Sequence, residues 1–413
     1  MATLVAWHGA RKVGTLTWVP PAWRFVYDDD WIAQPGSFLL SPHFPLQPGA
    51  FEGDSVKWFF QNLLPEGNLL LAVAAREGVR PDNAFALLSR LGKECAGALS
   101  LVPEGDPPPH AAGRYRELDS AELLRRVGEM ERAPLLTAAA DARMSLAGAQ
   151  DKLPIRYADG HMRIPLDYSP TTHILKPENI RRDLYPHTVL NEWFCMRLAA
   201  AAGMPAPSCE RIRIDEEWFY LIERFDRRAD AQGQIQRIHQ NDLCQVLDKW
   251  PDYKYEELGG ATLPEYFGAL DRYVASPAPA RLALLRWVVF NFLTGNSDAH
   301  AKNVSFLFDG RSLRLAPFYD LLCVKVYGDA RLAASIGDHN QYGWIERADW
   351  TRFARESRLN PKLVSTTLAD LAARLPKLAR NLAVRLTLED QERSFVERIL
   401  AVIDEHSRYA LAA

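Results

Sequence analysis

The amino-acid sequence predicts an α+β fold in which a small strand-rich N-terminal subdomain precedes a two-lobed core with a mainly helical C-terminal lobe. Three observations lead to this prediction. Short strand-like runs separated by turns fill residues 3–27, and residues 153–226 alternate such runs with one long helical pattern. From residue 240 onward, apolar residues recur mainly with the 3.6-residue period of helices. A chain of 413 residues is also too long for one simple core.

The first hundred residues begin with strands and continue with helices. Runs rich in β-branched and aromatic residues predict strands at 3–7, 13–19 and 23–27, and Gly9 supplies the positive φ of the first turn. Apolar stripes that end at proline or glycine predict three short helices after these strands. The helices lie at 54–64, 66–78 and 82–92.

A proline-rich segment, "PEGDPPPHAAGR" at 103–114, follows these helices. Three consecutive prolines beside glycine and aspartate exclude a helix or a central strand, so this segment is the predicted domain boundary. The chain then divides into three predicted domains, residues 1–105, 115–235 and 236–413.

The middle domain mixes strands with one helix, and the last domain is mainly helical. Strands are predicted at 153–158, 161–167 and 172–176, a helix at 187–203, and a hairpin of two strands at 211–226. The helices predicted in the last domain lie at 241–248, 263–274, 278–294, 361–387 and 389–410. A cleft between two such lobes is where nucleotides tend to bind.

Composition excludes several classes of protein. A net charge of −3 and a pI near 6.4 lack the basic excess of a dedicated nucleic-acid binder. Five scattered cysteines with no C-x-x-C pair argue against a disulfide framework and against a zinc site. The N-terminus lacks the pattern of a signal peptide, and no apolar run is long enough to span a bilayer. We therefore expect a cytoplasmic protein without a membrane partner.

The octapeptide "NSDAHAKN" at 296–303 carries the first candidate chemistry. Asp298 and Asn303 are five positions apart, the spacing that protein kinases use for a carboxylate that orients the attacking hydroxyl and an oxygen ligand of magnesium. The apolar helix pattern at 281–295 would give this loop rigid support. Aspartate and asparagine are also the commonest turn residues, so this pair alone favours an ordinary turn.

Three further residues would supply the other charges of a phosphoryl-transfer site. Asp320 follows "LRLAPFY", where kinases hold a second metal-binding aspartate, although alone it could cap a helix. Lys176 ends a strand, as the phosphate-pairing lysine of kinases does, although a single strand lysine more often faces solvent at a sheet edge. Glu192, sixteen residues further on, could pair with Lys176 or face solvent.

Two segments could hold the nucleotide. No glycine-rich phosphate motif exists, but the small residues of "MSLAGAQDKLPI" at 144–155 would let backbone N–H groups approach a phosphate, and Lys152 would add charge. A flexible connection between lobes would have the same composition. "LIERFD" at 221–226 could place backbone groups of Glu223 and Phe225 on an adenine edge, or could be a core strand that turns into a loop.

Seven segments, taken in order, resemble the HipA family of toxin serine/threonine kinases along nearly the whole chain. They are "FFQNLLPEG" (59–67), "SLAGAQDK" (145–152), "THILKP" (172–177), "NEWFCMRLA" (191–199), "LIERFDR" (221–227), "NSDAHAKN" (296–303) and "PFYD" (317–320). Seven motifs in the right order are far more specific than any one of them. The resemblance implies a small N-terminal subdomain packed on a two-lobed protein-kinase-like core.

The resemblance also implies roles for individual residues. Asp298 matches the catalytic base, Asn303 and Asp320 match the Mg²⁺ ligands, and Glu192 matches the ion-pair partner of Lys176. Ser145 matches the position that family members autophosphorylate, which switches the kinase off because the new charge lies beside the ATP phosphates. The residues matched to ATP binding are Ala147, Gly148, Ala149, Gln150, Lys152, Lys176, Glu223, Phe225, His300 and Tyr319.

Partners follow from the resemblance as well. The family binds a small HipB-like helix-turn-helix antitoxin and, through it, operator DNA, and its protein substrates include aminoacyl-tRNA synthetases, whose phosphorylation would inhibit translation. Composition indicates none of this. The local hint is a basic helical face, of a kind that is usually just solvated. It consists of Arg374, Lys377, Arg380 and Arg385.

Two other functions fit part of the pattern. Aminoglycoside and choline kinases share the Asp-x-x-x-x-Asn loop and a later aspartate, but the segment 145–152 and the N-terminal subdomain favour the HipA family. A catalytically silent co-repressor would only bind antitoxin and DNA. The intact set of lysine, two aspartates and asparagine argues against such a co-repressor. These residues are Lys176, Asp298, Asn303 and Asp320.

Overall fold

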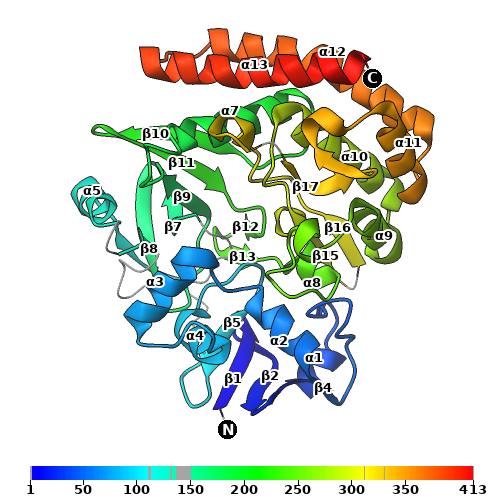
Figure 1. Cartoon of the computed structure of the whole chain (residues 1–413). Coiled ribbons are helices and arrows are strands. Elements are labelled where there is room, and N and C mark those ends of the chain that lie inside the picture. Colours follow the sequence, from blue (N-terminus) through cyan, green and yellow to red (C-terminus); the bar gives the residue numbers. More distant parts are fainter. Residues whose placement is uncertain are drawn as a thin grey trace.

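Figure 1 shows the computed structural model, which describes residues 2–109, 113–130, 133–135, 150–310, 312–329 and 331–412. In this view the N-terminal domain lies at the bottom, a strand-rich lobe at the left and a helical lobe at the right. Two long helices, α12 (Pro361–Val384) and α13 (Asp390–Ala412), pack together at the end of the molecule opposite the N-terminal domain. The predicted α+β class, with a strand-rich start and a helical end, is confirmed.

The N-terminal domain is a five-stranded antiparallel sheet covered by short helices. The strands and helices predicted before residue 92 are present, and the last strand, which was not predicted, returns to pair with the first. The sheet order is β4 (Ala50–Glu52), β3 (Ala22–Tyr27), β2 (Arg11–Val19), β1 (Ala2–His8) and β5 (Ser100–Pro103). The helices are α1 (Asp29–Ala33), α2 (Asp54–Gln61), α3 (Gly67–Glu77) and α4 (Ala84–Leu91).

The strand-rich lobe is a six-stranded antiparallel sheet with a buried helix against it. Its order is β10 (Cys209–Ile214), β11 (Glu217–Glu223), β9 (His173–Pro177), β7 (Leu153–Ala158), β8 (His161–Leu166) and β6 (Arg114–Glu117). The helices of this lobe are α5 (Ser120–Gly128) and α7 (Thr188–Ala201). Lys176 lies on β9 between two other strands, so the edge-strand alternative for this lysine is wrong.

The helical lobe contains more strand than the sequence predicted. Its helices are α8 (Leu243–Val246), α9 (Leu263–Tyr273), α10 (Pro277–Thr294), α11 (Arg347–Glu356), α12 and α13. The small sheets are formed by β12 (Arg227–Ala229) with β13 (Ile235–Arg237), by β14 (Gln240–Asp242), β15 (Ser305–Asp309) and β16 (Ser312–Leu315), and by β17 (Arg331–Ile336) with β18 (His339–Gln341).

The predicted helices of this lobe need two corrections. The helix expected at 241–248 is only the short α8, because residues 240–242 pair with β15 as a strand. Helix α11 was not predicted. Within the described ranges, no helix combines the length and the apolar character needed to cross a membrane.

Helix α10 supports the loop that follows it. Nearly all of its C-terminal half is buried, and it ends at Gly295 with a left-handed φ of 69°. A side chain at Gly295 would also collide with Lys325 and Val402, so glycine is required there for both conformation and space. The loop 296–303 then runs from this rigid helix into β15.

Candidate active site

One cavity of about 760 Å³ lies between the two lobes and the N-terminal domain. Every predicted site residue that the structure describes lines it. These residues are Gln150, Lys152, Lys176, Glu192, Glu223, Phe225, Asp298, His300, Asn303, Tyr319 and Asp320. Four other predicted site residues, Ser145, Ala147, Gly148 and Ala149, lie outside the described residues.

Lys176 is the centre of a buried ionic group. Its Nζ lies 2.8 and 2.9 Å from the two carboxylate oxygens of Glu192 and 2.8 Å from Oδ1 of Asp320. Strand β9 and helix α7 place the lysine and the glutamate side by side, so Glu192 does not face solvent. The arrangement holds the ammonium group at the cavity wall.

Lys176 and Asp320 stabilise each other's charge, whereas burial outweighs Lys176 at Glu192 and raises the pKa of Glu192 to about 7. Burial lowers the pKa of Lys176, but the carboxylates of Asp320 and Glu192 outweigh burial and raise it. Burial also opposes ionisation of Asp320, but Lys176 outweighs this effect and lowers the pKa of Asp320. For Lys152 the balance is reversed: burial and the charge of Lys176 outweigh the nearby carboxylates and lower its pKa to about 8. The wall of the cavity therefore keeps a strong positive charge at Lys176.

The loop 296–303 is held by its own side chains. The amide nitrogen of Asn303 donates to the carbonyl of Asp298 at 2.7 Å, and the Asp298 N–H donates to Oδ1 of Asn296 at 3.1 Å. His300 also donates its N–H to the Asp298 carbonyl, at 2.8 Å. This is more ordered than an exposed turn, and the Asp298 side chain remains 41% exposed to the cavity.

Asp320 has a backbone conformation that needs support. Its φ of 57° is in the left-handed region, which non-glycine residues enter at a cost. Its carbonyl accepts from the Asn296 amide at 3.4 Å, and Oδ1 accepts from Lys176. Such strain concentrates at functional sites, where the surroundings hold a side chain in one orientation.

The oxygens of Asp320 and Asn303 suit a hard divalent cation. Oδ1 of Asp320 is used by Lys176, whereas Oδ2 receives no hydrogen bond from the residues that the structure describes. Because the Asn303 amide nitrogen is bonded to the Asp298 carbonyl, its Oδ1 is the atom left for a cation. Two protein oxygens that leave the remaining positions to water and phosphate are typical of Mg²⁺ sites.

The segment after β11 could hold an adenine ring from one side. Glu223 donates its N–H to the carbonyl of Ser208 at 2.9 Å, so its carbonyl, and not its N–H, remains for a ligand. The Phe225 N–H has no acceptor among the described residues. The Phe225 ring lies 5.3 Å from the Tyr319 ring, and the Tyr319 hydroxyl donates to the Lys302 carbonyl at 2.6 Å.

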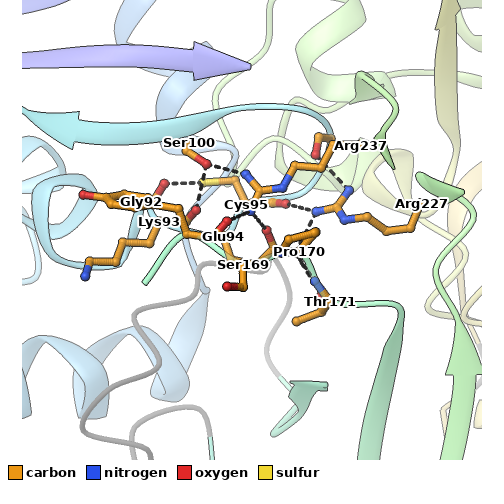
Figure 2. Close-up of polar contacts among 12 residues, drawn as sticks. Gly92, Lys93, Glu94, Cys95, Ser100, Ser169, Pro170, Thr171, Arg227 and Arg237 are labelled. Carbon is orange, nitrogen blue, oxygen red and sulfur yellow. Dashed lines mark hydrogen bonds and ion pairs between the residues drawn. The ribbon is translucent and has the colours of Figure 1, made fainter. Parts of the chain in front are cut away.

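A buried cluster of charged side chains includes Arg224 and Asp226, the two neighbours of Phe225 in the sequence. Figure 2 shows Arg227, Arg237 and Thr171 gathered around Glu94 of the N-terminal domain. Glu94 Oε1 lies 2.9 Å from Arg227 Nη2 and 3.2 Å from Arg224 Nη1, and Arg237 contacts Oε2. We call the residues involved the hinge cluster: Glu94, Thr171, Arg224, Asp226, Arg227 and Arg237.

The hinge cluster fixes the position of Phe225 through its neighbours. Arg224 pairs with Asp226 at 2.8 Å, and the Gly97 N–H of the N-terminal domain donates to Asp226 at 2.7 Å. Each charged side chain of the cluster is at most 7% exposed. Burial opposes ionisation of Glu94, but the three arginines outweigh it and lower the pKa of Glu94 to about 2.

Sequence reasoning missed many of the residues that line the cavity, and five of these are used in the argument below. None of them belongs to a motif with a known spacing for this chemistry, although Asn62 and Glu66 lie within the quoted segment 59–67. They are Asn62, Glu66, Asp242, Lys254 and Tyr255.

Fold and cavity together define a two-lobed protein of the kinase-like type. Family models bear this out: the HipA N-terminal domain matches residues 4–102, and the HipA-like C-terminal domain matches residues 144–379. The chain therefore belongs to the HipA family.

Individual relatives match along most of the chain. It is 31% identical over 431 residues to the serine/threonine-protein kinase toxin HipA of Shewanella oneidensis, covering 98% of this chain and 97% of that protein. It is 38% identical over 380 residues to the putative kinase Y4mE of Sinorhizobium fredii, covering 90% and 88%. The solved complex of Shewanella oneidensis HipA with HipB and its operator DNA matches with a TM-score of 0.88 and 29% identity, over 99% of this chain and 97% of that one. This likeness confirms the two-lobed kinase-like fold.

Proposed function

We propose that this chain is an ATP- and Mg²⁺-dependent serine/threonine-protein kinase and the toxin of a toxin–antitoxin module. The observation that carries the proposal is the convergence of Lys176, Glu192 and Asp320 with Asp298 and Asn303 on one cavity. Family membership and the similarity to a kinase toxin support the same conclusion.

The proposed reaction assigns one task to each residue. A substrate hydroxyl attacks the γ-phosphorus of ATP, its proton passes to Asp298, and ADP leaves. Lys176 binds phosphate oxygens, and Asn303 and Asp320 hold the metal. When bound, Mg²⁺ neutralises charge on the phosphates. Most of the rate would come from positioning and electrostatics, because this transfer needs little covalent chemistry from the protein.

The proposed nucleotide contacts divide between two sides of the cavity. Gln150, Lys152 and His300 would lie toward the phosphates, together with the small residues of the loop before them. Glu223, Phe225 and Tyr319 would contact the adenine. Ser145 would be the autophosphorylation site, where the added charge would be repelled by the phosphates of ATP.

The proposed partners are a protein substrate, such as an aminoacyl-tRNA synthetase, and a HipB-like antitoxin. The related HipA of Shewanella oneidensis was solved with HipB and operator DNA. We expect DNA contact here mainly through the antitoxin, because the basic face of α12 is partly neutralised. Arg374 pairs with Asp370, and Arg380 pairs with Asp404.

The test is phosphate transfer by the purified full chain with Mg²⁺ and γ-labelled ATP. We expect label at Ser145, located by mass spectrometry, and a loss of about 100- to 10,000-fold in Asp298→Asn, the range for removing a general base. Asp82→Asn is the matched control, because the Asp82 side chain is 67% exposed and its ion-pair partner in the described part of the chain is Arg80, at the surface.

Three other results would change the proposed function or the role of Asp298. Label that persists in Asp298→Asn contradicts the assignment of the base. A chain that binds no ATP in the presence of Mg²⁺ is the silent co-repressor. Label that passes to an aminoglycoside or choline, and to no protein, identifies a small-molecule kinase.

A further inference from the structure

The N-terminal segment 59–67 has no role in the chemistry proposed above, yet it reaches the cavity. Asn62 ends α2, Glu66 precedes α3, and both side chains line the cavity wall. The amide nitrogen of Asn62 donates to the carbonyls of Trp58 and Lys249, each at 3.0 Å. Asn62 is therefore fixed to both the N-terminal domain and the C-terminal lobe, with its oxygen free to accept another bond.

That oxygen holds Lys302, which lies in the catalytic loop beside Asn303. Nζ of Lys302 lies 2.6 Å from Oδ1 of Asn62, 3.2 Å from its carbonyl oxygen and 2.6 Å from Oδ2 of Asp242. An ammonium group has three N–H donors, so these acceptors use all of them. Lys302 therefore holds the loop in place.

Glu66 reaches the same loop by a second route. Nζ of Lys254 lies 2.7 Å from Oε2 of Glu66, and the Lys254 carbonyl accepts the N–H of Ala301 at 3.2 Å. The next residue, Tyr255, donates a short hydrogen bond from its hydroxyl to Oδ1 of Asp298. Lys254 and Tyr255, which are consecutive in the sequence, thus connect Glu66 of the N-terminal domain to the proposed base.

The hydrogen bond from Tyr255 holds one carboxylate oxygen of Asp298, the proposed base. The Tyr255 ring also packs edge-on against His300, with centroids 5.1 Å apart and an interplanar angle of 87°. Because Oδ1 of Asp298 accepts from Tyr255, this oxygen is anchored and the carboxylate has less freedom to rotate. The second oxygen, which receives no hydrogen bond from the described part of the chain, is then presented in a constant position to a hydroxyl.

We propose that Asn62 and Glu66 are positioning residues of the catalytic centre, so that the N-terminal domain completes the geometry of the loop that carries Asp298. We call the residues involved the loop contact: Asn62, Glu66, Asp242, Lys254 and Lys302. The inference rests on the proposed kinase function and goes beyond it, because it gives the N-terminal domain a part in the rate of phosphate transfer. Without Glu66, Lys254 and Tyr255 lose support, whereas the adenine side of the cavity is unchanged.

The test compares Glu66→Gln with Glu52→Gln. The chemical change is the same and both residues belong to the N-terminal domain, but Glu52 pairs with Arg24 on the exposed surface. We expect Glu66→Gln to lower the rate of phosphate incorporation at saturating Mg-ATP by about 10- to 100-fold, the effect of misplacing a reacting group by about 1 Å. The ATP concentration at half-maximal rate should change less than about twofold, and Glu52→Gln should match the wild type.

Tyr255→Phe is the second variant, and it changes the residue that contacts Asp298 directly. It removes only the hydroxyl that binds Asp298, and we expect the same loss of rate with the same ATP dependence. If thermal unfolding shows that Glu66→Gln is not folded, Tyr255→Phe decides the question.

The outcomes separate this inference from the proposed function. A wild-type chain that transfers no phosphate removes the kinase function itself. An active wild type with Glu66→Gln and Tyr255→Phe of equal or higher rate overturns the positioning role. A loss of rate explained by weaker ATP binding alone overturns it as well.

Discussion

Two of the polar contacts between the N-terminal domain and the rest of the chain, the hinge cluster and the loop contact, differ in burial and composition. The hinge cluster brings two carboxylates and three guanidinium groups together in the interior, each at most 7% exposed. The loop contact uses lysines, two carboxylates and an amide at the edge of the cavity. The first joins the domain to the proposed adenine side of the cavity, and the second joins it to the proposed base.

This difference has an energetic consequence. Removing one partner of a buried ion pair leaves an uncompensated charge in the interior, which costs several kcal/mol. In the loop contact the side chains of Glu66 and Lys254 are 13% and 17% exposed, so water can partly solvate either one when its partner is removed, and that change costs less stability. We therefore expect the hinge cluster to determine whether the domains stay together and the loop contact to determine how fast the reaction runs.

The largest expected effect is that of Glu94→Gln. This change leaves Arg224, Arg227 and Arg237 with one buried carboxylate in place of two, so we expect the free energy of unfolding to fall by about 3–5 kcal/mol. Urea denaturation measures it, and Glu52→Gln should stay within about 0.5 kcal/mol of the wild type. Equal midpoints for the two variants would contradict a stabilising role of the cluster.

The next effect is a dependence of stability on acid. The pKa of Glu94 is lowered from 4.5 to about 2 in the folded chain, so its contribution is present above pH 4.5 and is lost as the pH falls toward 2. The contribution is about 3 kcal/mol, from 1.36 kcal/mol per pKa unit. Unfolding midpoints measured from pH 5 to pH 2 should fall more steeply for the wild type than for Glu94→Gln. Parallel curves would show that another group carries the acid sensitivity.

The sequence predicted more of the proposed catalytic centre than of the hinge cluster. Asp298 and Asn303 were predicted from their five-residue spacing. The pairing of Lys176 with Glu192 was one of two alternatives, suggested by a strand lysine that is followed by a glutamate within an apolar helix. Glu94 and Arg237 belong to segments more than a hundred residues apart, and no periodicity indicates which buried glutamate will meet which arginine. Their pairing depends on the packing of one domain on another.

The prediction of a helix at 241–248 was wrong in its first residues for a related reason. The apolar pattern after residue 240 predicted a helix, but Asn241 pairs with Phe306 on β15, so tertiary pairing turned the first residues into a strand. Short apolar runs fit a buried strand and a helix equally well. The same strand ends at Asp242, which holds Lys302, and this explains why part of the loop contact was missed along with it.

A smaller effect is expected from Thr171→Val. The Thr171 hydroxyl donates to Glu94 Oε1 at 2.9 Å and accepts from Arg224 Nη1 at 3.0 Å, while the charges around it remain paired with one another. Loss of a buried hydrogen bond to charged groups should cost about 1–3 kcal/mol. Thr17→Val is the control, because its hydroxyl makes one long bond of 3.4 Å at the surface. A similar loss in both variants would mean that the hydroxyl in the cluster adds nothing.

The smallest expected effect is the coupling between the two regions. Thr171→Val and Glu66→Gln disturb groups that share no partner in the described part of the chain, since Glu66 contacts Lys254 and Lys302 only. Independent sites add within about 0.5 kcal/mol, so the double variant should lose the sum of the two single losses. Urea unfolding of the wild type, the two single variants and the double variant measures the coupling energy. A coupling above about 1 kcal/mol would show that the hinge cluster and the loop contact act as one unit, and the N-terminal domain would then affect adenine binding and phosphate transfer together.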